Sequence, residues 1–182
     1  MTGIGVNSAR RLLTVVAVAT TVLAGCGVGV PVVTEPACRA HQFPTPFDRV
    51  PPCSGPEVLL AAVAGLFAYD PATGVDPPTT FDRVRPLMSA PFQAKAAASV
   101  WVLSPVTIVD WNSWVKRGVT MRSEVAITGD DHPPDTATTT ARVLSVRLAP
   151  ANMTPIVFAV YSRAVRVSAE SAWLITDLRM PS

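Results

Sequence analysis

Apolar residues recur along this chain with two different periods, first that of helices and then that of strands. In the segment 56–69 they lie three and four positions apart, which places them on one side of a helix. The stripe consists of Leu59, Val63, Leu66 and Phe67. Ser54 and Glu57 have the spacing of a capping box, so we expect the helix to begin there. Further short helices are predicted at 79–85 and 91–98.

From residue 119 onward, apolar and polar residues alternate, which is typical of strands with one buried face. The predicted strands are 119–128, 136–148, 156–167 and 171–178. The apolar phase changes by one residue within both the second and the third of them, which predicts β-bulges and a strongly curved sheet. We expect Val125, Ile127 and Trp173 to join the helical stripe in the core.

The segment 101–114 has no clear period, and its end is expected to lead into the sheet. The predicted fold class is therefore α+β, with N-terminal helices packed on a strongly curved, mostly antiparallel four-stranded sheet.

A continuous apolar run, residues 12–22, lies near the start of the chain. It follows Arg10-Arg11 and ends at Leu23-Ala24-Gly25-Cys26. A basic start, about a dozen apolar residues and small residues before the cleavage site indicate a secretory signal peptide over residues 1–25. The cysteine directly after Leu-Ala-Gly resembles that of bacterial lipoprotein signals, which is thioether-linked to diacylglycerol before cleavage. The resemblance implies lipidation of Cys26 and an extracytoplasmic location on the cell membrane.

Three other interpretations of this run are less consistent with it. A spanning helix needs about 20 apolar residues, and the glycines between Gly25 and Gly29 interrupt the run too early. An ordinary cleaved signal leaves Cys26 without a role. Twin-arginine export prefers a polar residue after the arginine pair, which is missing here, so the general secretory route is favoured.

Cleavage after residue 25 of 182 leaves 157 residues, the size of one domain. The full chain has 15 basic and 13 acidic residues; loss of Arg10 and Arg11 balances them. A neutral protein has no basic field to attract nucleic acid, so nucleic-acid binding is disfavoured. Proline and glycine are frequent over 26–55, which predicts an extended tether, followed by a single domain over 56–182.

Two cysteines, Cys38 and Cys53, remain if Cys26 carries lipid. A disulfide is expected between them in an oxidising compartment, and a loop of about 15 residues makes it worth up to ~3 kcal/mol. A metal site with His41 is an alternative, as are free thiols. Structural zinc requires four ligands, and the other histidine, His132, is distant in the chain. No metal or cofactor is therefore predicted.

The last predicted strand reads Trp173-Leu174-Ile175-Thr176-Asp177-Leu178. Helices followed by long bent strands, ending in such a W-x-V/I-x-x-L pattern, resemble nuclear-transport-factor-two-like (SnoaL-like) domains, over residues 56–180. Two segments, 83–89 and 130–136, look like parts of exported proteins of conjugative elements from GC-rich Gram-positive bacteria. The resemblance implies a cone-like fold and a role in a transfer apparatus.

The densest polar cluster is Asp130-Asp131-His132-Pro133-Pro134-Asp135. A histidine with carboxylates could act as a general acid/base set or bind a divalent ion, but aspartate, glycine and proline here also suit a hairpin connection, which we favour. The chain lacks the G-x-S-x-G, H-E-x-x-H and C-x-x-C motifs and a glycine-rich phosphate loop. No catalytic residue is assigned, and the protein is predicted not to be an enzyme.

Aromatic and arginine residues supply the remaining candidates. Trp101, Trp111 and Trp114 could line a pocket at the mouth of the cone, although core or interface positions are favoured. Four strand arginines are expected on the wet face of the sheet: Arg142, Arg147, Arg163 and Arg166. If that face binds another protein, these arginines and Tyr161 would be its anchors.

Three functions are consistent with these features. The favoured one is a non-catalytic, lipid-anchored accessory or assembly protein with a protein partner in the cell envelope, as in a conjugation or secretion apparatus. The alternatives are a lipoprotein that binds a small ligand in the cone interior, and a hydrolase or isomerase with an acid/base pair pointing into that interior. The placement of Asp110, Glu124 and the arginines relative to the sheet distinguishes them.

Overall fold

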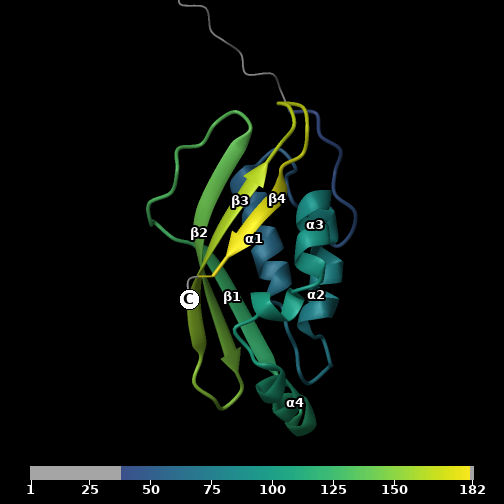
Figure 1. Cartoon of the computed structure of the whole chain (residues 1–182), viewed down its shortest axis with the longest axis vertical. Coiled ribbons are helices and arrows are strands. Elements are labelled where there is room, and N and C mark those ends of the chain that lie inside the picture. The colour runs from purple at the N-terminus through teal and green to yellow at the C-terminus, as the bar shows by residue number, and fades with distance from the viewer. Residues whose placement is uncertain (1–37, 181–182) are drawn as a thin grey trace, which may run out of the picture. The chain divides into compact units, whose positions relative to one another are not determined.

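Helices come first in the chain and strands follow (Figure 1). The computed structural model describes residues 38–180. Within them the helical elements are α1 (Gly55–Leu66), α2 (Pro77–Val84), η1 (Arg85–Leu87), α3 (Ala90–Ala97), η2 (Val100–Leu103) and α4 (Ile108–Arg117). The strands are β1 (Met121–Ile127), β2 (Thr139–Pro150), β3 (Ile156–Val165) and β4 (Leu174–Arg179). They pair antiparallel in the order β1-β2-β3-β4, so the predicted α+β class and strand number are confirmed.

Helix α1 is the central element of the helical layer and contacts all four strands. It begins as the capping pattern predicts, because the Ser54 hydroxyl accepts a hydrogen bond from the Glu57 backbone N–H at 3.4 Å. Its buried side comprises Val58, Leu59, Ala62, Val63 and Leu66. Helix α2 packs on α1, and α3 packs on β4. The helices α1, α2 and α3 therefore cover one face of the sheet (Figure 1).

The strand pleat separates a helix-facing side from an open side. On β2 the even-numbered residues Leu144, Val146 and Leu148 are fully buried beneath the helices. Their partners on β3 continue the same layer, and the ring of Phe158 stacks edge-on against Phe67 at 5.1 Å. Helix-facing side chains thus form the core, while the odd-numbered residues of β2 and β3 lie on the open face.

The segment 101–114 differs from the sequence prediction, because most of its second half belongs to helix α4. Thr107 caps this helix by accepting from the Asp110 N–H at 3.1 Å. Gly118 ends it in the left-handed conformation, with φ at 62°, which glycine adopts without a steric penalty. Trp111 and Trp114 are three positions apart and both are buried. A spacing of three positions between two buried residues is typical of a helix. Within residues 38–180 no helix has the length and hydropathy to span a bilayer.

The segment before α1 is also more ordered than an extended tether. Phe43 and Phe47 are buried and belong to the hydrophobic core. Cys38 and Cys53 are joined by the predicted disulfide, with their Cα atoms 5.7 Å apart. The prediction of an unpacked segment over 26–55 is therefore wrong from Phe43 onward, because two aromatic rings in a closed loop have apolar surface to bury. The predicted signal peptide and Cys26 lie outside the described residues.

The two predicted bulges have different outcomes. The β1–β2 and β2–β3 registers run without a shift, so the bulge predicted within 136–148 is wrong. The apolar phase changes there because Val143 is buried on the open face, while Leu144 is buried beneath the helices. A register shift does occur between Arg163 and Ala164, and its extra residue, Thr176, lies on β4.

Core membership follows the sequence prediction except at the edge strand. Leu59, Val63, Leu66, Phe67 and Trp173 are buried. Val125 is half-buried, whereas Ile127 is 38% exposed. Ile127 is the last residue of β1, an edge strand, so alternation alone overestimated its burial.

Trp173 connects the disulfide loop to the sheet. Its indole Nε1–H donates to the Cys53 carbonyl oxygen at 3.2 Å, and its backbone N–H donates to the Pro52 carbonyl oxygen at 2.9 Å. The guanidinium of Arg166 lies 4.8 Å from the centre of its ring. The backbone and side chain of Trp173 thus connect the loop before α1 to the strand at the end of the domain.

Replacing Trp173 with alanine should lower the free energy of unfolding by about 3–5 kcal/mol, since a buried aromatic ring is lost. Trp173→Phe should lower it less, because a smaller aromatic ring remains in place although the bond to Cys53 is lost. Tyr161→Ala, at a half-exposed ring, is the aromatic control and should cost far less. Equal losses for Trp173→Ala and Tyr161→Ala in denaturant titrations would contradict this role of Trp173.

Candidate binding site on the open face of the sheet

Side chains from three strands form two rows across the open face. In the first row Val143, Tyr161 and Arg179 lie opposite one another on β2, β3 and β4. In the second row Ala141, Arg163 and Asp177 do the same. Directly opposite residues of antiparallel strands have Cβ atoms about 4.5–5.5 Å apart. Three long side chains on β3 and β4, together with that of Asp177, therefore stand beside two small ones on β2.

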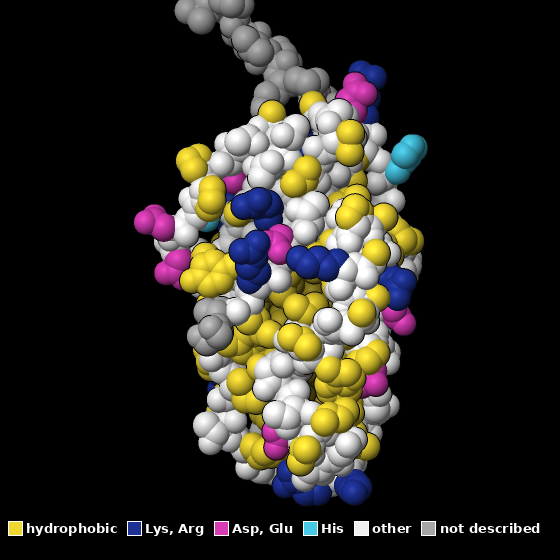
Figure 2. Space-filling model, viewed as in Figure 1, with side chains coloured by type: hydrophobic (Ala, Val, Ile, Leu, Met, Phe, Trp, Pro, Cys, Tyr) yellow, Lys and Arg dark blue, Asp and Glu magenta, His cyan; other side chains and the backbone are white. Residues whose placement is uncertain are grey.

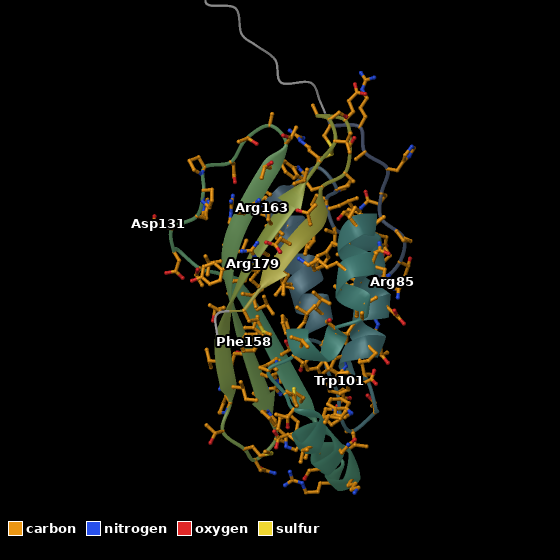
Figure 3. The ribbon with its side chains drawn as sticks, viewed as in Figure 1. Arg85, Trp101, Asp131, Phe158, Arg163 and Arg179 are labelled. Atoms are coloured by element: carbon orange, nitrogen blue, oxygen red, sulfur yellow. A yellow bond between two sulfur atoms is a disulfide. The ribbon has the colours of Figure 1, made fainter. Side chains whose placement is uncertain are left out.

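The short side chains of β2 leave a depression of about 470 Å³, here called the open-face hollow. The connection between β1 and β2 forms its far wall, so Asp131 lies across from Arg163 and Arg179 (Figure 3). It is lined by Asp131, His132, Pro133, Ala141, Arg142, Val143, Tyr161, Ser162, Arg163, Asp177, Arg179 and Met180. The half-exposed ring of Tyr161 offers an apolar surface within a charged rim.

The register shift in β4 determines which residues reach this face. Ile175 and Leu178 are both buried although they are three positions apart, which the extra residue Thr176 permits. Asp177 and Arg179 are consequently both directed to the open face, opposite Arg163 and Tyr161. Without the shift, strict alternation would place Ile175, Asp177 and Arg179 on one face.

An ion pair fixes the wall of the hollow. Arg142 donates from Nη1 and Nη2 to the two carboxylate oxygens of Asp135 at 2.7 and 2.6 Å. The Thr140 hydroxyl donates to the same carboxylate at 2.7 Å. The hydrogen bond from Arg142, with a smaller contribution from Thr140, lowers the pKa of Asp135 from 3.8 to about 2. The pair holds the connection 128–138 against β2 where β1 no longer pairs with it.

Some of the charged side chains that face the hollow form ion pairs, and Arg163 does not within residues 38–180. Arg142 is occupied by Asp135, and Arg179 Nε lies 2.8 Å from a carboxylate oxygen of Asp177. The ion pairs of residues 38–180 include none for Arg163. A cluster of Lys and Arg side chains around one acidic side chain is visible in Figure 2, next to a hydrophobic area. Arg163 therefore presents a guanidinium with free donors beside an aromatic ring.

The helix-facing side of the sheet, in contrast, contains a much smaller cavity. A cavity bounded by residues that include Phe67, Tyr69 and Leu178 has a volume of about 10 Å³, close to the minimum for one water molecule. Burial raises the pKa of the Tyr69 hydroxyl to about 12. This cavity is far smaller than the roughly 300–1,000 Å³ of small-molecule sites, so it cannot hold such a ligand.

The predicted aromatic site residues lie in two different places. Trp111 and Trp114 are core residues of α4, and Trp111 stacks edge-on against Tyr69 and Trp101 at 6.3 and 6.2 Å. Trp101 is half-buried and borders a second depression of about 350 Å³ beside α2. Tyr161 is on the open face, in the hollow. The tryptophans therefore group together, and Tyr161 belongs to another site.

The predicted arginine face is correct in part. Arg147 and Arg163 are exposed and belong to the open face. Arg142 instead turns to the connection 128–138, and Arg166 stacks on Trp173. Neither belongs to the open-face row, because Arg142 is an even-numbered residue of β2 and Arg166 follows the end of β3.

The carboxylates that would have indicated an enzyme lie outside the interior. Asp110 accepts from the Thr107 hydroxyl at 2.7 Å, at the start of α4. Glu124 is exposed and lies 3.5 Å from Arg147. Within the 130–135 cluster, Asp130 accepts from Thr128, and Asp135 pairs with Arg142.

The whole 130–135 cluster lies in the β1–β2 connection, as the turn interpretation predicts. His132 lies there beside its neighbour's backbone, with Nδ1 2.9 Å from the Pro133 carbonyl oxygen. No group of three or more His, Cys, Asp or Glu side chains among residues 38–180 is placed to hold a metal ion.

Sequence reasoning missed Asp177, Arg179 and Met180 as site residues. Asp177 is only one letter of the predicted strand pattern, and nothing in that pattern shows the register shift that turns it to the open face.

Comparison with models of protein families, with curated proteins and with solved structures found no match to this chain.

The wall of the hollow should respond to acid through Asp135. A carboxyl whose pKa is lowered on folding stabilises the protein above its unfolded pKa of about 4, and this contribution is lost as the pH falls through about 2. NMR titration of the side-chain carboxyl carbon should give a midpoint near pH 2. In Arg142→Gln the midpoint should move toward 3.8. A midpoint at the ordinary value in the wild type would mean that the pair does not form in solution.

Proposed function

We propose that the chain is a lipid-anchored, non-catalytic binding protein on the extracytoplasmic face of the cell membrane, which docks a protein partner on the open face of its sheet. One observation carries the proposal. The open face has a hollow of about 470 Å³ with a half-exposed tyrosine and an arginine that has no ion pair among residues 38–180, whereas a cavity on the helix-facing side measures about 10 Å³.

The composition of this face supports docking of a protein. Tyrosine, arginine and methionine are enriched where proteins meet, and the hollow offers Tyr161, Arg163, Arg179 and Met180. Val157, two pairs along the same face of β3, is 63% exposed. Tyrosine and arginine also account for many of the residues that dominate binding energy.

The anchor is supported by the sequence and by the disulfide. Arg10-Arg11, the apolar run and Leu23-Ala24-Gly25-Cys26 form the lipoprotein pattern. Pairing of Cys38 with Cys53 suits an oxidising compartment outside the cytoplasm. Residues 27–37 would then separate the lipid from the disulfide loop, which marks the start of the packed domain.

We also propose that the domain is a divergent cone-like relative of nuclear-transport-factor-two-like domains, and that it serves a conjugation or secretion apparatus. Helices packed on one face of a four-stranded antiparallel sheet support this relationship, as does the register shift next to the W-x-I-x-x-L strand. The strong curvature of a cone belongs to this proposal.

A photo-cross-linking experiment in the cells that make the protein tests both the docking of a partner and the lipid anchor. With p-benzoylphenylalanine in place of Tyr161, ultraviolet light should produce an adduct in the membrane fraction. The same probe in place of Val167, which is 94% exposed but outside the hollow, is the control and should produce none. Adding Arg163→Glu should remove the adduct at 161. Cys26→Ala should move the protein to the soluble fraction.

Equal adducts from positions 161 and 167, or none from either, would contradict docking on the open face. A Cys26→Ala protein that stays membrane-bound, together with a wild-type mass that lacks acyl chains, would contradict the anchor.

A further inference from the structure

We infer that the open-face hollow recognises a carboxylate that lies next to an apolar side chain, and hence an acidic segment of the partner protein. This inference rests on the proposed docking function and specifies its chemistry. No catalytic step is involved. The carboxylate would occupy the donors of Arg163, and the neighbouring apolar group would cover the ring of Tyr161.

The position of Arg163 suits a carboxylate. Its neighbours in the row are Ala141 and Asp177. Asp177 is engaged by Arg179, with Nε and Oδ2 2.8 Å apart. The Arg163 fork is consequently available, and arginine binds carboxylates through two parallel hydrogen bonds. The small side chain of Ala141 leaves room beside the guanidinium for an incoming group.

The charge balance of the hollow selects a singly charged group. Arg142 and Arg179 are neutralised by Asp135 and Asp177. Asp131 adds a negative charge on the opposite wall. A phosphate dianion would meet the Arg163 guanidinium, which has no ion pair among residues 38–180, and the Asp131 carboxylate on the opposite wall. The carboxylate would repel a dianion more strongly than a singly charged group. A singly charged carboxylate matches the guanidinium of Arg163, the one arginine of the hollow without an ion pair in the described part of the chain.

An apolar surface lies directly beside the free guanidinium. Tyr161 is two residues from Arg163 on the same face of β3, and its ring is half-exposed. Val143 lies opposite Tyr161 and forms a buried floor, and Met180 completes this side of the hollow. A small carboxylate ion would leave this apolar surface exposed to water, whereas an acidic residue flanked by an aromatic or aliphatic residue would cover it.

The geometry of the wall is consistent with a peptide. The bidentate Asp135–Arg142 pair holds the connection 128–138 in place, so the hollow exists before the ligand binds. Preformed sites lose less entropy when they bind. The hollow lies open on the sheet face, so an extended segment can enter without any element moving.

Fluorescence anisotropy with full-length protein in detergent micelles provides the test. The probes are a labelled Gly-Phe-Glu-Phe-Gly peptide, blocked at both ends, its Gln counterpart, and inorganic phosphate as competitor. The Glu peptide should bind about ten- to a hundredfold more tightly than the Gln peptide, as loss of a charge-assisted hydrogen-bonded pair predicts. Phosphate should compete only weakly.

Two variants assign the effect to the hollow. Arg163→Gln should remove the preference for the Glu peptide. Arg147→Gln removes the same charge from the same face of the sheet, outside the hollow, and should keep the preference. Both arginines are exposed, so both variants should fold.

Equal affinity for the two peptides, a preference that survives Arg163→Gln, or phosphate that competes as well as the Glu peptide would each overturn the inference. If any of these results is found while position 161 still forms adducts in cells, the proposed docking face is retained and only its preference for a carboxylate is rejected. Absence of both adducts and peptide binding would remove the two together.

Discussion

The antiparallel pairing of β3 with β4, with its shift of one residue, is the constraint on which the open face depends. A strand that alternates strictly directs every second residue to one face. The extra residue Thr176 breaks this rule once, so Ile175 and Leu178 both enter the core. Asp177 and Arg179 then lie beside Arg163 and Tyr161. The core and the candidate site are thus consequences of the same irregularity.

The two faces of the sheet have different roles: one forms the core and the other carries the candidate site. The helices bury the even-numbered residues of β2 and β3, which stabilises the domain through apolar burial. The open face contributes little to that core and carries charged and aromatic side chains instead. We therefore expect Arg163→Gln to change the proposed binding without unfolding the protein, and changes at Trp173 to destabilise it, because Trp173 connects the disulfide loop to the sheet.

Much of the fold was predictable because it depends on local patterns. Apolar spacing and capping located α1, α2 and α3 to within a few residues, and alternation located all four strands. Helix α4 was missed although the Thr107 cap and the Trp111/Trp114 spacing signalled it, because the segment 101–114 as a whole has no clear period. The burial of Phe43 and Phe47 in the core was not predicted. The frequent prolines indicate a stiff backbone, but they do not show that two aromatic side chains of the same segment pack against the domain.

The candidate site was less predictable because it depends on pairing between strands. Tyr161 and Arg163 were named from the sequence as anchors of a possible docking face. Their partners Asp177 and Arg179 were not, since a register shift cannot be deduced from one strand alone. The predicted arginine row lost Arg142 and Arg166 to partners at the edge of the sheet, which only the three-dimensional arrangement reveals.

The most direct measurement of whether the open face is occupied is the rate at which a single introduced thiol reacts with a membrane-impermeant maleimide. The rate is measured in intact cells and again in the purified protein, for Tyr161→Cys and for Val102→Cys, a 76% exposed position on η2. A partner docked on the open face predicts that Cys at 161 reacts at least tenfold more slowly in cells than when purified, while Cys at 102 reacts similarly in both. Equal rates at 161 in cells and in the purified protein would contradict a docked partner.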